Sequence, residues 1–185
     1  ALATIISGLG LKKMSRSHPL SLRDSMFVCT FSWVILSFLG AIPFKVILDI
    51  NFLDAYFETM SGFTTTGITM LTGIDTMPRS ILFWRALTQW IGGLGILSMF
   101  ILIGFKGGAA ANKIFSAEGH KISMKKPFPG IFHTARILWL LYICFSLAET
   151  ALLMLLGLDF FDALTHTFTT LSTGWYSMYD SSIAH

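Results

Sequence analysis

Two short polar runs, each carrying a glycine, are the parts of this sequence whose residue types could hold an ion. The first is TTTGIT at 64–69, and the second is STGWYS at 172–177. A monovalent cation that enters a membrane needs oxygen ligands in place of its water shell, and rings of backbone carbonyls supply them in selectivity filters. Glycine lets the backbone turn carbonyls toward one axis because it has no Cβ. The two runs therefore predict ion-binding loops, with Ser and Thr hydroxyls as further oxygen donors.

Each polar run follows an apolar-rich segment that is too short to cross a membrane. The segment before the first run, FLDAYFETMSGF, has 12 residues at 52–63. As a helix it would be about 18 Å long, and a bilayer core is about 30 Å thick. A half-length helix followed by non-helical backbone is a re-entrant loop, which is tolerated only where protein buries it or where it lines water. The alternative, that each run merely joins two helices, is disfavoured because the pattern occurs twice.

The two runs belong to a longer internal repeat. Residues 158–171 align with residues 50–63. Four identities, each 108 residues apart, support the alignment: Phe52 with Phe160, Asp54 with Asp162, Ala55 with Ala163, and Thr59 with Thr167. One residue drops out before the glycine, so Gly67 is expected to pair with Gly174. A parallel repeat of this kind implies a symmetry axis along the membrane normal.

The composition indicates a membrane protein. Of the 185 residues, 54% are hydrophobic and 12% are charged, and the mean hydropathy is +0.69. Soluble domains carry about 25% charged residues, so the low charge excludes an ordinary cytosolic domain. The high hydrophobic content excludes a disordered chain. Three stretches approach the length of about 20 residues that a transmembrane helix needs: Met26–Phe44, Ala86–Phe105 and Ile137–Leu158.

The basic residues predict an orientation. Segments 12–23 and 106–136 hold 10 of the 13 Lys and Arg residues. The positive-inside rule places both segments in the cytoplasm. It places the acidic segments 49–78 and 159–185, which carry the two polar runs, on the outer side.

These features predict an all-α polytopic membrane protein of repeated helix–re-entrant pore loop–helix units, which is a channel-like fold. The short apolar run at the start and the abrupt end suggest a fragment of a longer protein. The expected organisation is, in order, the end of a preceding transmembrane helix at 1–11, a cytoplasmic basic loop at 12–23, a first repeat at 24–105, a cytoplasmic linker at 106–136, and a truncated second repeat at 137–185.

Three ordered motifs resemble the Trk/Ktr/HKT superfamily of potassium transporter subunits. SGFTTTGIT at 61–69 resembles the first pore loop of that family, and FWRALTQWIGGLGI at 83–96 resembles the helix that follows it. LDFFDALTHTFTTLSTG at 158–174 resembles the second pore loop. The resemblance implies one chain of four non-identical repeats around a central pore, of which this sequence would hold the first and most of the second.

The resemblance also implies a function. It predicts a multi-pass protein of the cell membrane that takes up potassium, sometimes with sodium, and that needs no cofactor and catalyses no reaction. Membrane lipid would surround it, and a homodimer and a cytosolic nucleotide-binding regulatory subunit are its implied partners. The net charge of +3 is too small to indicate binding to nucleic acid. The predicted potassium-binding residues are Thr64, Thr65, Thr66, Gly67, Leu171, Ser172, Thr173 and Gly174.

One departure from the family affects the predicted ion preference. After Gly174 the family usually has Gly-Phe-Ser or a similar run, whereas this sequence has Trp175, Tyr176 and Ser177. A sodium-permeable or poorly selective transporter therefore stays an alternative, as does a non-conducting scaffold subunit. With Ile68 as its counterpart in the first repeat, Trp175 is expected to point behind the filter and to brace the loop.

Two ionisable residues in the membrane segments require a separate interpretation. Glu149 lies within the third span, where a carboxyl group either serves function or is protonated and hydrogen-bonded between helices. His166 takes the place of Glu58 in the repeat. An intramembrane enzyme that uses Glu149 or His166 is disfavoured because the sequence has no paired catalytic group at helical spacing. The glycine-rich GGLG at 92–95 is expected to let helices pack closely.

Overall fold

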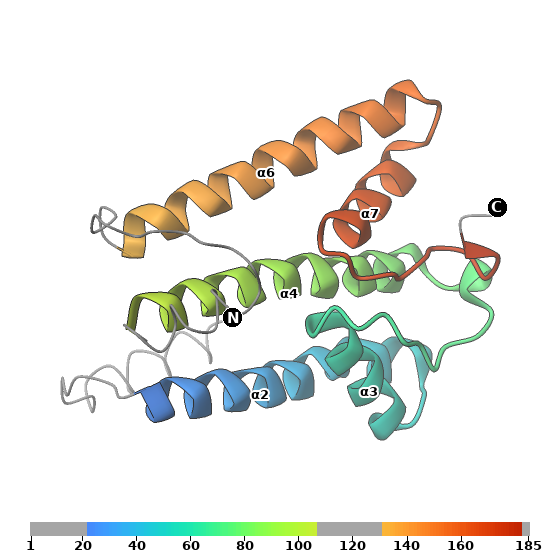
Figure 1. The fold of residues 1–185 in the computed structure, drawn as a ribbon. Helices are drawn as coiled ribbons and strands as arrows, with labels where there is room; N and C mark the ends of the chain where they lie inside the picture. Colours follow the sequence, from blue (N-terminus) through green and yellow to red (C-terminus); the bar gives the residue numbers. More distant parts are fainter. Residues whose placement is uncertain (1–21, 107–130, 183–185) are drawn as a thin grey trace.

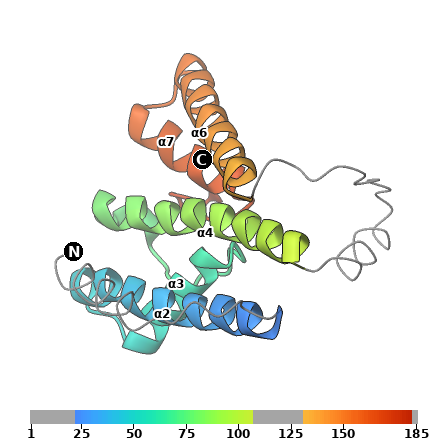
Figure 2. The same ribbon diagram turned by 90° about the vertical axis from the view of Figure 1, so that its left-hand side faces the viewer.

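The computed structural model of the chain describes residues 22–106 and 131–182, and the regular structure within those ranges is helical. Three helices are long: α2 (Leu22–Leu48), α4 (Arg79–Lys106) and α6 (Ile131–Leu155). Two are short: α3 (Phe52–Phe63) and α7 (Phe160–Leu171), and a single 3₁₀ turn, η1, covers Ile74–Thr76. The long helices run beside one another, with α4 between α2 and α6 (Figures 1 and 2).

Two of the three predicted spans meet the length and hydropathy of a membrane-crossing helix, namely Thr30–Leu48 in α2 and Ala135–Leu155 in α6. Most of their side chains face outward, and the exposed ones are largely apolar. An outward apolar surface suits a lipid environment, because contact with lipid tails removes these side chains from water. The third predicted span lies in α4, which has a different character because it packs inside the structure and carries buried polar residues near its beginning.

The internal repeat is confirmed at the level of the helices. The predicted half-length segment 52–63 forms α3, and its repeat forms α7, each with 12 residues. Each short helix follows a long one by a tight connection and folds back against it, so that α2 with α3 and α6 with α7 are equivalent pairs (Figure 1). Each also carries an acidic residue in its first turn, Asp54 or Asp162, which complements the positive end of the helix dipole.

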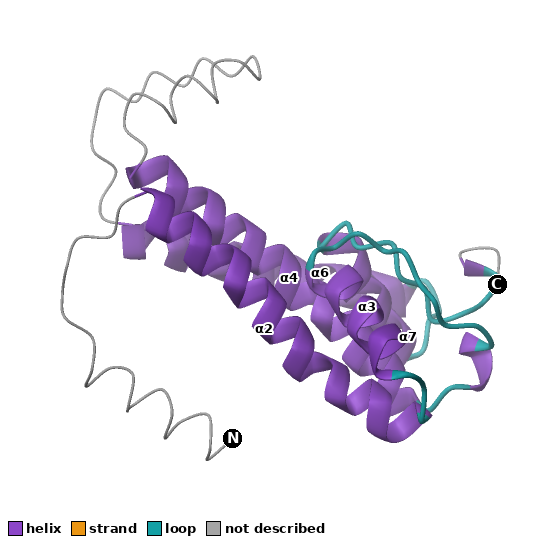
Figure 3. Cartoon of the chain, turned by 90° about the horizontal axis from the view of Figure 1, so that it is seen from below, coloured by secondary structure: helices purple, strands orange, loops and turns teal. Residues whose placement is uncertain are grey.

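The short helices and the loops that follow them gather at one end of the long helices (Figure 3). An apolar core there joins α2, α3 and the beginning of α4 through Phe44, Ala55, Leu71 and Ile81. A second apolar cluster joins Leu82 and Ala86 of α4 to Met178, which follows the second polar loop. Helices of the first repeat therefore contact the segments around both polar loops.

The boundaries of the predicted organisation are only partly within the described residues. Residues 1–11, and most of 12–23 and 106–136, lie outside them. Helix α6 begins at Ile131, six residues before the predicted start of the second repeat at 137. The prediction began that span after the last charged residue, Arg136, which is exposed on the helix. A helix can continue beyond the bilayer, so the boundary of the linker stays a prediction.

The prediction that the glycines of α4 allow close helix packing is confirmed. A Cβ at Gly92 would overlap the backbone carbonyl of Phe63 at the end of α3. A Cβ at Gly93 would lie 3.1 Å from the backbone of Ser172, at the end of α7. These two neighbouring positions let one helix approach the ends of both short helices.

We expect Gly92→Ala to destabilise the protein by about 1–3 kcal/mol, because its Cβ meets backbone that cannot move aside. A loss of stability would be informative, since a change from Gly to Ala inside a helix otherwise stabilises by about 0.5–1 kcal/mol. Gly95→Ala is the matched control, because its Cβ would meet the far end of the Trp33 ring, 2.6 Å away, and a ring can shift. Thermal unfolding of the purified protein in detergent measures both. Equal melting temperatures for the two variants would contradict the packing at Gly92.

Candidate ion-binding site

The two polar loops leave the short helices with the same backbone conformation. Thr65 and Thr173 have φ angles of 54° and 53°, and Gly67 and Trp175 have φ angles of 77° and 67°. Each loop thus has left-handed residues at two positions separated by one residue. Left-handed backbone is uncommon for any residue with a Cβ, and three of these four residues have one. Because such backbone is uncommon, its occurrence at matching positions indicates that the two loops are built to the same backbone geometry.

Hydrogen bonds at the ends of the short helices give the same correspondence. Two successive N–H groups in each loop donate back into the preceding helix: Thr65 to the carbonyl of Gly62 and Thr66 to that of Ser61, and Thr173 to that of Thr170 and Gly174 to that of Thr169. Every donor and acceptor in the second loop stands 108 residues after its partner in the first.

The predicted loss of one residue before the glycine is therefore wrong. Gly174 corresponds to Thr66, and Trp175 corresponds to Gly67 instead of Ile68. The sequence alignment matched glycine with glycine, whereas the backbone conformation is set by the distance from the helix end. Trp175 thus adopts the conformation that glycine adopts in the first loop.

Gly67 is required in the first loop for two reasons. Its φ of 77° is readily adopted only by glycine. A Cβ there would also overlap the carbonyl oxygen of Gly174 and lie 2.6 Å from the Cβ of Trp175. The two loops therefore lie in contact, as the prediction of a shared ion path needs.

A buried ion pair holds the first loop. Arg85 of α4 donates from Nε to Oε1 of Glu58 in α3 over 2.6 Å, and the two side chains are 1% and 0% exposed. The Glu58 carboxylate also accepts from the hydroxyl of Thr69 at 3.0 Å and from the N–H of Met70 at 3.1 Å. The charge of Glu58 is thus satisfied by the helix on one side and by the loop on the other.

The same arginine holds the second loop. Its Nη1 donates to the carbonyl of Ser177 over 2.6 Å, and its guanidinium lies 3.8 Å from the centre of the Tyr176 ring. The Tyr176 hydroxyl in turn donates to the backbone carbonyl of Glu58 at 2.7 Å. Arg85 therefore links the two repeats through a hydrogen bond, an ion pair and a cation–π contact.

The segment after the second loop is anchored by carboxylates. The Tyr179 hydroxyl donates to Asp162 at the start of α7 over 2.7 Å, and this hydrogen bond raises the pKa of Tyr179. The N–H of Asp180 donates to Asp75 in the first repeat at 3.2 Å. Contacts from both repeats thus hold the chain that follows the second loop.

The predicted site residues lie at the helix ends and in the loops. Thr64 and Ser172 cap α3 and α7, and their hydroxyls donate to carbonyls one turn earlier, those of Met60 and Phe168, at 2.7 Å. Leu171 is the last residue of α7. Glu149 lies on α6 beside Thr170, and whether it serves function stays a prediction. No group of three or more metal-ligating His, Cys, Asp or Glu side chains occurs among the described residues.

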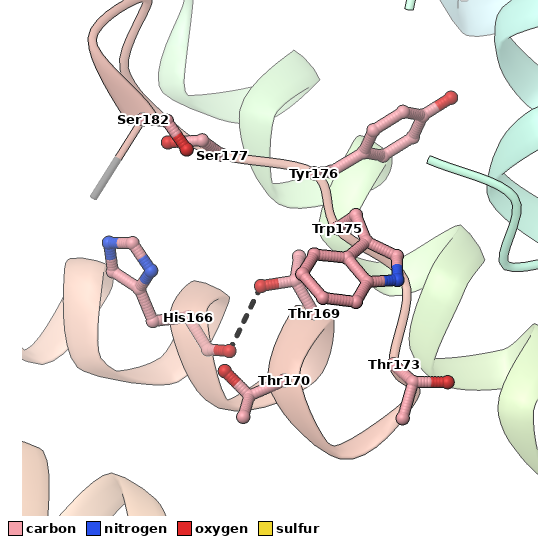
Figure 4. Close-up of a pocket in the computed structure, with 8 residues that line it drawn as sticks. All are labelled: His166, Thr169, Thr170, Thr173, Trp175, Tyr176, Ser177 and Ser182. Carbon is pink, nitrogen blue, oxygen red and sulfur yellow. Dashed lines mark hydrogen bonds between the residues drawn. The ribbon is translucent and has the colours of Figure 1, made fainter. Parts of the chain in front are cut away.

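The prediction that Trp175 packs behind the loop and braces it is wrong for the described structure. Its indole is 79% exposed. It lines a pocket of about 270 Å³ beside α7 (Figure 4). The lining residues are His166, Thr169, Thr170, Thr173, Trp175, Tyr176, Ser177 and Ser182.

His166 occupies the place that Glu58 has in α3, as the repeat predicted.

Sequence reasoning missed Arg85 and Gln89, two fully buried polar residues of α4. The available signal was an arginine and an amide inside the motif FWRALTQW, at the start of a predicted membrane helix. The predicted span began at Ala86, because the charged Arg85 was taken as the boundary of the membrane segment.

Residues 1–185 match the TrkH family, described as cation transport protein. The chain belongs to this family. It is 36% identical over 97% of its length to an uncharacterized cation transporter of Methanocaldococcus jannaschii, and 36% identical over 88% of its length to the Trk system potassium uptake protein TrkH of Escherichia coli K12. These matches confirm the resemblance drawn from the three motifs.

A solved structure supports the TrkH fold as well. The crystal structure of the potassium transporter TrkH from Vibrio parahaemolyticus matches 92% of this chain with a TM-score of 0.72 and 32% identity. The predicted fold class, an all-α polytopic membrane protein with repeated pore-loop units, is therefore confirmed. The chain spans 38% and 34% of the two sequence relatives and 34% of the solved chain.

We expect Gly67→Ala to reduce cation uptake by about tenfold or more, because it combines left-handed strain with overlap at the second loop. Gly73→Ala is the matched control. Gly73 has a similar φ of 71°, but the nearest atom to its Cβ would be the Thr76 hydroxyl at 3.6 Å. Radioactive rubidium uptake by cells that express the complete protein containing this sequence measures both. If both variants lose uptake equally, backbone strain alone matters and contact between the loops does not.

Proposed function

We propose that the complete protein containing this sequence takes up potassium across the cell membrane through a channel-like pore. The observation that carries the proposal is the matched backbone of two loops in contact, each placed at the end of a half-length helix. In an extended chain successive carbonyls point to opposite sides. A left-handed residue at every second position turns the peptide groups so that neighbouring carbonyls point to the same side. Relatives from Escherichia coli and Vibrio parahaemolyticus are named for potassium uptake and transport.

The ligand chemistry favours a monovalent cation. The loops 64–69 and 172–177 contain no Asp or Glu, whereas Ca²⁺ and Mg²⁺ sites rely on carboxylates. The negative ends of the α3 and α7 dipoles lie where the loops begin, which favours positive charge there. The proposed ion-binding positions are Thr64, Thr65, Thr66 and Gly67 in the first loop and Leu171, Ser172, Thr173 and Gly174 in the second.

The proposal extends to the setting of the pore. The protein crosses the membrane several times, with the basic segments 12–23 and 106–136 inside and the two loops toward the outer side. It works as a transporter and catalyses no chemical reaction. A homodimer and a cytosolic nucleotide-binding regulatory subunit are the proposed partners, and potassium is the substrate.

Trp175 supports a second candidate, a sodium-permeable or poorly selective transporter. It stands where the first loop has Gly67, and although its side chain is bulky it adopts a left-handed backbone conformation that glycine adopts more readily. A difference at this one position makes the two loops chemically unequal. Unequal ligands around an ion weaken the discrimination between potassium and the smaller sodium ion.

The test is rubidium flux into liposomes that contain the complete protein. We expect flux that unlabelled potassium inhibits at much lower concentration than sodium does. Equal inhibition by the two ions would select the poorly selective transporter. No flux above that of protein-free liposomes would contradict both candidates and indicate a non-conducting subunit. Liposomes with the Gly67→Ala variant are the control for flux through the pore.

A further inference from the structure

The side chain of Gln89 on α4 hydrogen-bonds the backbone of the second loop at two points. Its Nε2 donates to the carbonyl of Gly174, and its Oε1 accepts from the N–H of Tyr176 at 3.3 Å. The side chain is 0% exposed. A primary amide offers a donor and an acceptor side by side, and both are used here by the same stretch of backbone.

The two bonded groups lie on either side of Trp175. The Gly174 carbonyl belongs to the peptide group before Trp175, and the Tyr176 N–H belongs to the peptide group after it. Only the φ and ψ angles of Trp175 relate these two peptide planes. Gln89 therefore holds both angles of the one residue between its two hydrogen bonds.

Trp175 needs this support because its backbone is left-handed. Its φ is 67°, a region that is unfavourable for a residue with a Cβ and most of all for a bulky one. Gly67, at the same place in the first loop, adopts a φ of 77° without that penalty. The second loop thus reaches the conformation of the first by a different means.

The fit around Gln89 is tight. A Cβ at Gly174 would overlap the Gln89 amide, so the glycine is what lets the amide approach. One turn earlier on α4, Arg85 bonds the carbonyl of Ser177. Two residues of one helix thereby bond three backbone groups of the second loop, the Gly174 carbonyl, the Tyr176 N–H and the Ser177 carbonyl.

We propose that Gln89 is a positioning residue for the ion path, and that it determines ion selectivity by holding Trp175 in the left-handed conformation. This inference rests on the proposed function. Gln89 acts from the first repeat on the loop of the second. If it is lost, the peptide groups on both sides of Trp175 can rotate, and the carbonyls of the second loop lose their alignment with those of the first.

The test compares four proteins: wild type, Gln89→Met, Trp175→Gly and the double variant. Methionine keeps the length of the glutamine side chain and removes its hydrogen bonds. We expect Gln89→Met to make sodium about tenfold more effective as an inhibitor of rubidium uptake, as the loss of two hydrogen bonds implies. In the double variant, glycine adopts the left-handed conformation unaided. Sodium should therefore inhibit rubidium uptake by the double variant at least about threefold less effectively than it inhibits uptake by Gln89→Met. Leu87→Met on the same helix controls for the added methionine.

The outcomes separate this inference from the proposed function. No rubidium uptake by wild type would contradict the proposed function, and the melting temperatures of the same four proteins would then test the link between Gln89 and Trp175. Uptake by wild type with no change in Gln89→Met, or with effects that simply add in the double variant, would overturn the inference. If Gln89→Met fails to accumulate, accumulation of the double variant supports the inference, and its failure as well contradicts it.

Discussion

The buried ion pair between Glu58 and Arg85 is the interaction on which the arrangement of both loops depends. It joins the short helix of the first repeat to the long helix that follows, and each partner also bonds a loop. Removing one member of such a pair leaves a charge without a partner, which costs about 3–5 kcal/mol. Replacing both members of a buried pair by apolar residues of similar volume is often neutral or even stabilising. We therefore infer that this pair contributes more to specifying the arrangement than to overall stability.

Helix α4 has a second role besides completing the first repeat, since it forms the surface against which the second loop folds. Arg85, Gln89 and Gly93, each one turn apart, meet loop two or the end of α7. Each repeat has its own short helix, but a helix of the first repeat positions the loop of the second. A change in α4 is expected to act first on the loop of the neighbouring repeat.

The sequence predicted the helices well because their signals are local. The half-length segments, their repeat and the close packing of Gly92 follow from apolar length, spacing and residue size. The register of the second loop was not predictable from residue identity, because Trp175 takes the conformation of Gly67 while Gly174 takes that of Thr66. The partners of Glu58 were also beyond sequence reasoning, since Arg85 and Thr69 reach it only in the folded chain.

A double-mutant cycle on Glu58 and Arg85 tests the central claim most directly. The variants Glu58→Gln, Arg85→Met and their combination are compared by melting temperature and by rubidium uptake. We predict that each single change lowers both strongly, and that the double variant melts at a higher temperature than Arg85→Met because no unpaired buried carboxylate is left. Uptake should stay low in the double variant, since Ser177 and Tyr176 have still lost Arg85. Effects that add, or normal uptake in Arg85→Met, would contradict the claim that this pair holds the two loops together.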